Sequence, residues 1–168
     1  MYNKAEFEKA LKAIDLEIEN NPENTDAWGT KATLLLKLAE LTDSDDVEKA
    51  HYLQGGIDSA TVGLSQDGNE LRLWDLLATC HIQMANVVGN EESEAQHLDK
   101  ALYAIEQALI ISDKLAGFWF VKGFIYDRKG DSDKARLAFD KATLLDINLI
   151  DELPDEYKAE YGQTSSGF

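Results

Sequence analysis

Three tryptophans recur at a nearly constant interval, and this interval is the strongest constraint on how the 168-residue chain folds. Trp28, Trp74 and Trp119 are 46 and 45 residues apart. A candidate turn residue stands six positions before each of them, namely Pro22, Gly68 and Asp113. Self-similarity at a fixed period of this length is typical of stacked supersecondary units that each contact only their neighbours. We therefore predict a repeat architecture.

Apolar residues at helical spacing indicate that each unit is a pair of helices. Phe7, Leu11, Ile14 and Ile18 follow one another at steps of 4, 3 and 4 residues, which is one stripe of a 3.6-residue period. The chain has only two prolines, and proline interrupts helices and central strands. We predict an all-α fold with helices over 3–20, 24–41, 45–66, 69–88, 91–112, 115–129 and 132–146.

Small residues at fixed offsets complete the pattern, which resembles the tetratricopeptide repeat. The signature of that repeat is W-x₂-L-G-x₂-Y, followed by A-x₃-F and a closing proline. The best copy consists of Trp119, Lys122, Gly123, Tyr126, Gly130, Ala135, Phe139 and Ala142. It departs from the signature at Lys122 and at Ile147, where leucine and proline are usual. The earlier copies consist of Trp74, Leu77, Ala78, His81, Ala101, Ile105 and Ala108, and of Trp28, Lys31, Ala32, Leu35, Gly56, Ala60 and Gly63.

The resemblance implies a right-handed superhelix of antiparallel helix hairpins, an α-solenoid, over residues 1–149. Residues 7–22 would be the second helix of an incomplete leading unit, and residues 150–168 a capping segment with a flexible tail. A generic helical repeat of the HEAT type is the alternative, because its period is also about 40–47 residues. The first two copies carry 12 and 11 extra residues between their helices. Eleven residues are about three helical turns, so longer hairpins keep their facing stripes in register.

Capping residues and the tail give three local predictions. Ser44–Asp46 and Asn90–Glu92 are expected to cap the lengthened second helices at their N-termini. Pro154 suits the first turn of a short helix that runs through Tyr161, and Gln163–Gly167 is expected to be disordered. Leu149, Ile150 and Leu153 are expected to cover the last apolar face.

Charge and composition exclude several classes of function. Sixteen Lys and Arg against 32 Asp and Glu give a formal charge of −16, which disfavours binding to nucleic acid or to anionic lipid. No apolar run approaches the ~20 residues that span a bilayer. The single cysteine, Cys80, excludes an internal disulfide framework. Acidic residues interrupt residues 1–20, so no secretory signal is expected and the location is predicted to be cytoplasmic.

The sequence contains no arrangement of residues that points to catalysis. His51, His81 and His97 form no metal-ligand motif. On a helix, the adjacent Cys80 and His81 point about 100° apart and cannot act as nucleophile and base. Both are expected in the core, with a reactive thiol as the lesser alternative. The acidic run at Asp43 lacks the glycine and the twelfth-position glutamate of a calcium loop. We therefore expect no enzyme activity, no metal and no cofactor.

The resemblance also suggests where a partner would bind. In tetratricopeptide proteins, one flank of the first helices lines a concave groove that holds an extended peptide or a partner helix. With each tryptophan at 0°, offsets of +1, +5 and +8 lie near 80–140°. The candidate groove residues are Thr33, Leu36, Lys37, Asp75, Thr79, Ile82, Gln83, Phe120, Phe124, Asp127 and Arg128. Leu36, Ile82, Phe120 and Phe124 would form an apolar stripe, unless the tail or a neighbouring helix covers the two phenylalanines.

These features predict a non-catalytic protein–protein interaction scaffold. Its partners would present basic or apolar segments, because an acidic surface repels acidic ones. A secretion or assembly chaperone and a structural oligomer subunit are the alternatives. The net charge is −13 over residues 1–111, +2 over 112–141 and −5 over 142–168. This asymmetry suggests either that the acidic tail folds over the basic last repeat, or that molecules associate head to tail.

Overall fold

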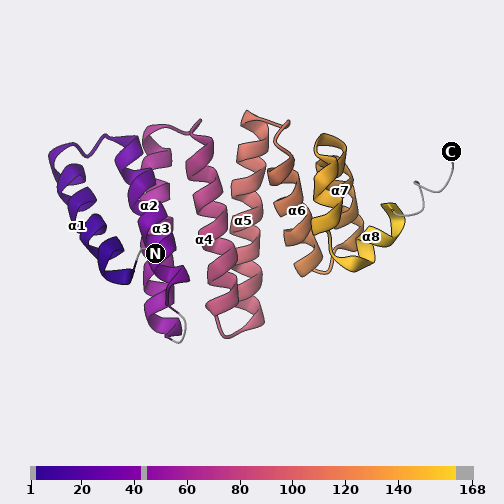
Figure 1. Ribbon diagram of the computed structural model, residues 1–168, viewed down its shortest axis with the longest axis horizontal. Coiled ribbons are helices and arrows are strands. Elements are labelled where there is room, and N and C mark those ends of the chain that lie inside the picture. The colour runs from indigo at the N-terminus through magenta and orange to yellow at the C-terminus, as the bar shows by residue number, and fades with distance from the viewer. Residues whose placement is uncertain (1–2, 43–44, 162–168) are drawn as a thin grey trace. The chain divides into compact units, whose positions relative to one another are not determined.

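The computed structural model describes residues 3–42 and 45–161, and in this part of the chain every regular element is a helix. The helices are α1 Lys4–Asn20, α2 Thr25–Glu40, α3 Asp46–Gln66, α4 Leu71–Val87, α5 Glu91–Ile111, α6 Ala116–Arg128, α7 Ser132–Leu145 and α8 Asp155–Tyr161, with the 3₁₀ helix η1 at Ile147–Glu152 (Figure 1). The all-α prediction is confirmed, and the seven long helices lie within two residues of their predicted bounds. The sequence did not predict η1. The predictions for Asp43, Ser44 and Gln163–Gly167 lie outside the described residues.

Polar residues cap the helices where the sequence placed them. Asp45 accepts hydrogen bonds from the backbone N–H groups of Val47 and Glu48, each at 3.0 Å, and so caps α3. The Asn90 side chain accepts from the backbone N–H of Ser93 at 2.8 Å at the start of α5. Each cap satisfies backbone donors that have no partner within the helix. Both predicted caps of the lengthened helices are therefore confirmed.

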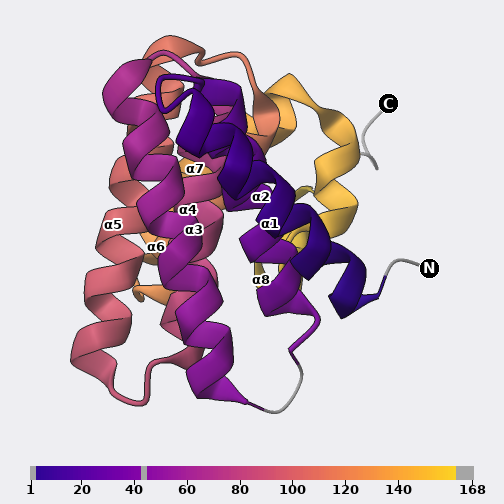
Figure 2. The ribbon, with the colours of Figure 1, turned by 90° about the vertical axis from the view of Figure 1, so that its left-hand side faces the viewer.

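The chain divides into two compact units, Met1–Ala108 and Leu109–Phe168. In the first unit, α1 packs on α2, α2 on α3 and α3 on α4 (Figures 1 and 2). Its largest fully buried side chains include Leu38, Leu53 and Leu73, and burying each of them contributes about 1.5–3 kcal/mol. The predicted division at residue 149 differs from this one and stays a prediction.

Small residues bring the helices of the first unit together. A Cβ on Gly56 of α3 would lie 2.8 Å from Sγ of Cys80 on α4, and a Cβ on Gly63 would lie 2.7 Å from Cδ1 of Leu73. Real Cβ atoms essentially never approach other atoms this closely, so a larger residue at either position would require the facing side chain on α4 to shift. The small residues of the repeat pattern thus lie at helix–helix contacts, as their common face predicts.

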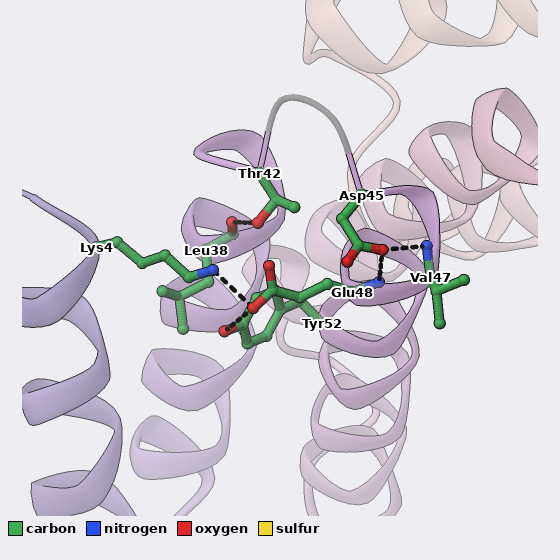
Figure 3. A network of polar contacts seen from close by, with 7 residues as sticks. All are labelled: Lys4, Leu38, Thr42, Asp45, Val47, Glu48 and Tyr52. Carbon is green, nitrogen blue, oxygen red and sulfur yellow. Dashed lines mark hydrogen bonds and ion pairs between the residues drawn. The ribbon is translucent and has the colours of Figure 1, made fainter.

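A polar network ties the start of α1 to the start of α3 (Figure 3). Nζ of Lys4 lies 2.6 Å from Oε1 of Glu48, and the Tyr52 hydroxyl donates to the same oxygen at 3.2 Å. The Lys4 ammonium also lies 5.5 Å from the centre of the Tyr52 ring, within the range of a cation–π interaction. Hydrogen bonding to Lys4 lowers the pKa of the Glu48 carboxyl group. The network attaches α1 to the lengthened part of α3.

In the second unit, α6 and α7 form a hairpin, and η1 and α8 follow it. Phe139 is fully buried and packs with Ala135, Leu153 and Tyr157. The Phe139 and Tyr157 rings meet edge to face, with centroids 4.8 Å apart. The predicted short helix after Pro154 is therefore present, and Leu153, predicted to cover the last apolar face, is buried against it. Leu149 and Ile150 are half-buried.

The interval between the tryptophans and their turns has a direct structural cause. The indole N–H of each tryptophan donates to the backbone carbonyl oxygen six residues earlier, at 2.7 Å for Trp28 and 2.8 Å for Trp74 and Trp119. The acceptors belong to Pro22, Gly68 and Asp113. Every residue type has a backbone carbonyl, so the side chain at the turn can differ while the offset stays constant.

Candidate functional site

The predicted groove residues of the first unit lie on two helices that contact each other, α2 and α4. Arg72 of α4 donates from Nη2 to Oγ1 of Thr33 on α2 at 3.2 Å. Gln83 donates from Nε2 to Oε1 of Glu40 at 3.4 Å. These two contacts, about three helical turns apart along α4, hold the two helices together along one surface. We call this surface the α2–α4 face; it consists of Thr33, Leu36, Lys37, Arg72, Asp75, Thr79, Ile82 and Gln83.

Solvent reaches the members of the α2–α4 face to different degrees. Lys37 and Asp75 are exposed, and Thr33, Thr79, Ile82 and Gln83 are half-buried. Leu36 is only 7% exposed and belongs to the core of the unit. The expected apolar stripe is therefore represented here by Ile82. Lys37 pairs with Glu40 one turn along, at 2.7 Å.

Asp75 is the electrostatically unusual member of the α2–α4 face. Solvent reaches its side chain, yet enough protein surrounds the carboxyl group that desolvation raises its pKa. Within residues 3–42 and 45–161, it has no hydrogen-bond or ion-pair partner. A carboxylate that is partly desolvated and unpaired is stabilised by any cation that reaches it.

The groove residues predicted in the second unit lie on α6, and α8 contacts one of them, Asp127. Phe120 is half-buried and packs on Phe139 with ring centroids 5.5 Å apart, next to the cluster that holds Tyr157. The Tyr157 hydroxyl donates to Oδ1 of Asp127 at 2.7 Å. Phe124 remains 42% exposed, and Arg128 is half-buried. The last segment thus contacts α6 through the hydrogen bond to Asp127, and Phe120 packs against the cluster that includes Phe139, Leu153 and Tyr157.

Solved structures share this arrangement of helices. A tetratricopeptide protein from Thermus thermophilus, TTC0263, superimposes with a TM-score of 0.66 at 18% identity, over 84% of this chain and 67% of that one. A crystal structure of MamA gives 0.63 at 20% identity, over 88% and 73%. MamA from Desulfovibrio magneticus RS-1, from residue 41 to its end, gives 0.65 at 17% identity, over 86% and 68%.

The fold is that of a tetratricopeptide-repeat protein. No protein-family model matches the sequence, and a search of curated proteins found no match either. The repeat-like pattern of tryptophans and small residues therefore corresponds to a tetratricopeptide-like structure at low sequence identity. None of the helices in the described part of the chain is long and apolar enough to cross a membrane.

Two repeat positions hold unusual residues in the second copy, and both are buried as predicted. Cys80 is fully buried, and burial raises the pKa of its thiol to about 12, so the reactive thiolate is scarce at neutral pH. His81 stands where the tetratricopeptide signature has tyrosine and is 6% exposed. Burial lowers its pKa to about 4. Both side chains lie in the core of the first unit.

The sequence did not reveal two arrangements that the structure contains. Arg72 lies two residues before Trp74, an offset of 160° on the helix, beside the 140° of the +5 position; extending the search to negative offsets would have found it. His81 and His97 approach each other with their Nδ1 atoms 3.0 Å apart. The two histidines are 16 residues apart and lie on different helices, so no periodic pattern in the sequence connects them. Only the packing of α4 against α5 reveals this pair. Within the described part of the chain, no group of three or more potential metal-ligating side chains occurs.

Proposed function

We propose that this chain is a non-catalytic interaction scaffold whose α2–α4 face binds a peptide or partner helix that carries a cationic side chain beside an apolar one. The carboxylate of Asp75 is the observation that carries this proposal. It is accessible, partly desolvated and without a partner among the described residues, so a lysine or arginine from outside would stabilise it.

Two further features support a cationic partner. The formal charge of −16 favours the approach of positive segments and repels negative ones. Ile82 is half-buried two turns along α4 from Asp75, so an apolar side chain of the partner can contact it while a cation lies at Asp75. The tetratricopeptide-like fold is consistent with binding another polypeptide chain.

A peptide array followed by affinity measurements tests the proposal. The array would vary the number of Lys, Arg, Leu and Glu residues in extended 12-residue peptides, and fluorescence anisotropy would give Kd for the best binder. We expect Asp75→Asn, which keeps the shape and removes the charge, to weaken binding roughly tenfold. Ile82→Ala should weaken it as well, and the charge-dependent part should shrink as salt shortens the Debye length.

Asp58→Asn is the matched control. Asp58 is exposed on α3, where its partner is Gln54 of the same helix, and it lies outside the α2–α4 face. If Asp58→Asn weakens binding as much as Asp75→Asn, only net charge matters and the assigned face is wrong. Selection of acidic peptides by the array would also overturn the proposal.

A further inference from the structure

His81 of α4 and His97 of α5 form a pair of imidazoles in the first unit. Their Nδ1 atoms are 3.0 Å apart, and the ring centroids are 5.3 Å apart with planes tilted by 41°. His81 is almost fully buried, whereas His97 is half-buried. In the absence of any ligand, one Nδ1–H donates to the other Nδ1, which requires different tautomers in the two rings.

The separation of the two nitrogens also suits two neighbouring ligands of one metal ion. With metal–nitrogen bonds of about 2.0–2.1 Å, donors 3.0 Å apart subtend roughly 91–97° at the metal. Tetrahedral zinc would need the nitrogens about 3.3–3.4 Å apart. A right angle is the geometry of square-planar and tetragonal sites, which Cu²⁺ and Ni²⁺ prefer with nitrogen and oxygen ligands.

We propose that His81 and His97 form a two-histidine site for a divalent copper or nickel ion, with water in the remaining positions. Solvent reaches the site from the side of His97, so water can complete the coordination. Binding requires both Nδ1 lone pairs. The proton that the rings share at Nδ1 therefore moves to Nε2 of the same ring, and the pair loses no proton overall.

The repeat structure shows that the second copy alone brings two histidines to these positions. The matching residues are Leu35 and Tyr52 in the first copy and Tyr126 and Asp131 in the last. Asp131 is the N-cap of α7, so in the last copy the helix only begins at this position. In the second copy α5 begins at Glu91, which places His97 within a helix opposite His81. The lengthened hairpin creates the pair.

Nearby charges modulate the affinity of the site. Burial is the main cause that lowers the pKa of both rings, and the positive charge of Lys100, on the same helix as His97, lowers it further. The same repulsion weakens the binding of a metal cation. Removal of this charge should therefore tighten binding severalfold, which is a response that an unrelated surface site would not show.

Calorimetric titration of the untagged full chain with CuCl₂ and, separately, with NiCl₂ tests the proposal at pH 7.5. We expect one ion per chain for the wild type, a Kd at least tenfold weaker for His97→Ala, and tighter binding for Lys100→Gln. Electron paramagnetic resonance of the Cu²⁺ complex should show an axial spectrum with hyperfine coupling to two nitrogens. Circular dichroism establishes that each variant is folded.

His51→Ala is the matched control, because His51 is an exposed histidine on α3 of the same unit. It should bind like the wild type. Equal affinities for the wild type and His97→Ala would show that the ion binds elsewhere and would overturn the proposal. A wild-type Kd weaker than 1 mM for both ions would overturn it too, and would leave the imidazoles as a hydrogen-bonded pair.

Discussion

A Cβ atom on Gly123 would lie 2.5 Å from both Cδ1 and Cε1 of Phe139, the fully buried ring at the centre of the second unit. Phe139 cannot retreat easily, because Tyr157, Ala135 and Leu153 pack around it in the buried cluster. Gly123→Ala should therefore lower the free energy of unfolding by about 1–3 kcal/mol through overpacking. Urea denaturation followed by circular dichroism measures this change.

Replacement of Gly117, on the same helix as Gly123, should have the opposite effect on stability. A Cβ there meets no atom within 4 Å, and alanine loses less backbone entropy on folding than glycine. Gly117→Ala should raise the free energy of unfolding by about 0.4–1 kcal/mol. Equal destabilisation by both variants would show that helix α6 responds to glycine replacement in general and not to the contact with Phe139.

The three tryptophan hydrogen bonds predict similar costs for similar substitutions. Trp119→Phe removes the indole donor and leaves the carbonyl of Asp113 without it, which should cost about 0.5–1.5 kcal/mol. Trp28→Phe and Trp74→Phe remove the equivalent bonds and serve as internal comparisons. In the wild type, hydrogen exchange measured by NMR should show slow exchange of the three indole N–H protons. Free exchange of all three would contradict the assigned bonds.

The effects of Gly56→Ala and Cys80→Ala on the free energy of unfolding should not be additive. Gly56→Ala alone places a Cβ 2.8 Å from Sγ of Cys80 and should cost about 1–3 kcal/mol. Cys80→Ala alone removes a buried sulfur and should also destabilise the unit. In the double variant the new methyl group takes up part of the space that the sulfur leaves. The double variant should therefore lose less stability than the sum of the losses of the two single variants. Additive losses would argue against the contact.

Tyr157 should make the second unit sensitive to alkali. Burial and the hydrogen bond to Asp127 raise the pKa of its hydroxyl to about 12, from an ordinary 10. The unfolded chain therefore releases this proton first, and the corresponding stability is complete below pH 10 and is lost as the pH rises through 12. At pH 8, Tyr157→Phe should be less stable than the wild type by about 1–3 kcal/mol.

The difference in the free energy of unfolding between the wild type and Tyr157→Phe should narrow between pH 10 and 12. Using Tyr157→Phe as the reference removes the contribution of the other tyrosines, because both proteins share them. A difference that stays constant over this range would show that the Tyr157 hydroxyl ionises as it does in water.

The sequence predicted the helices well because most of them are long, carry apolar residues at helical spacing and are bounded by a polar cap or a turn. It missed η1, since Ile147 replaces the proline that would mark the end of the repeat and six residues are too few to show a period. It also assigned Leu36 to an accessible stripe. Leu36 lies 80° from Trp28 around the helix axis, at the edge of the core stripe. This angle does not show whether the neighbouring helix covers the side chain.

Contacts between helices were harder to predict than the helices themselves. The meeting of His81 and His97 depends on how α4 and α5 are aligned, and the alignment depends on the turn at residues 88–90. The contact of Tyr157 with Asp127 depends on the path of η1, which the sequence pattern did not contain. Local periodicity determines which face of a helix is apolar, whereas such contacts depend on the geometry of each connection.

Leu153 and Tyr157 occupy the apolar face that the α6–α7 hairpin would otherwise offer to a further hairpin. A second molecule that stacked end to end at this place would first have to expel both side chains and break the bond to Asp127. Fibre growth by that route would then be limited by a unimolecular opening step, with a rate that stops rising once protein concentration is high.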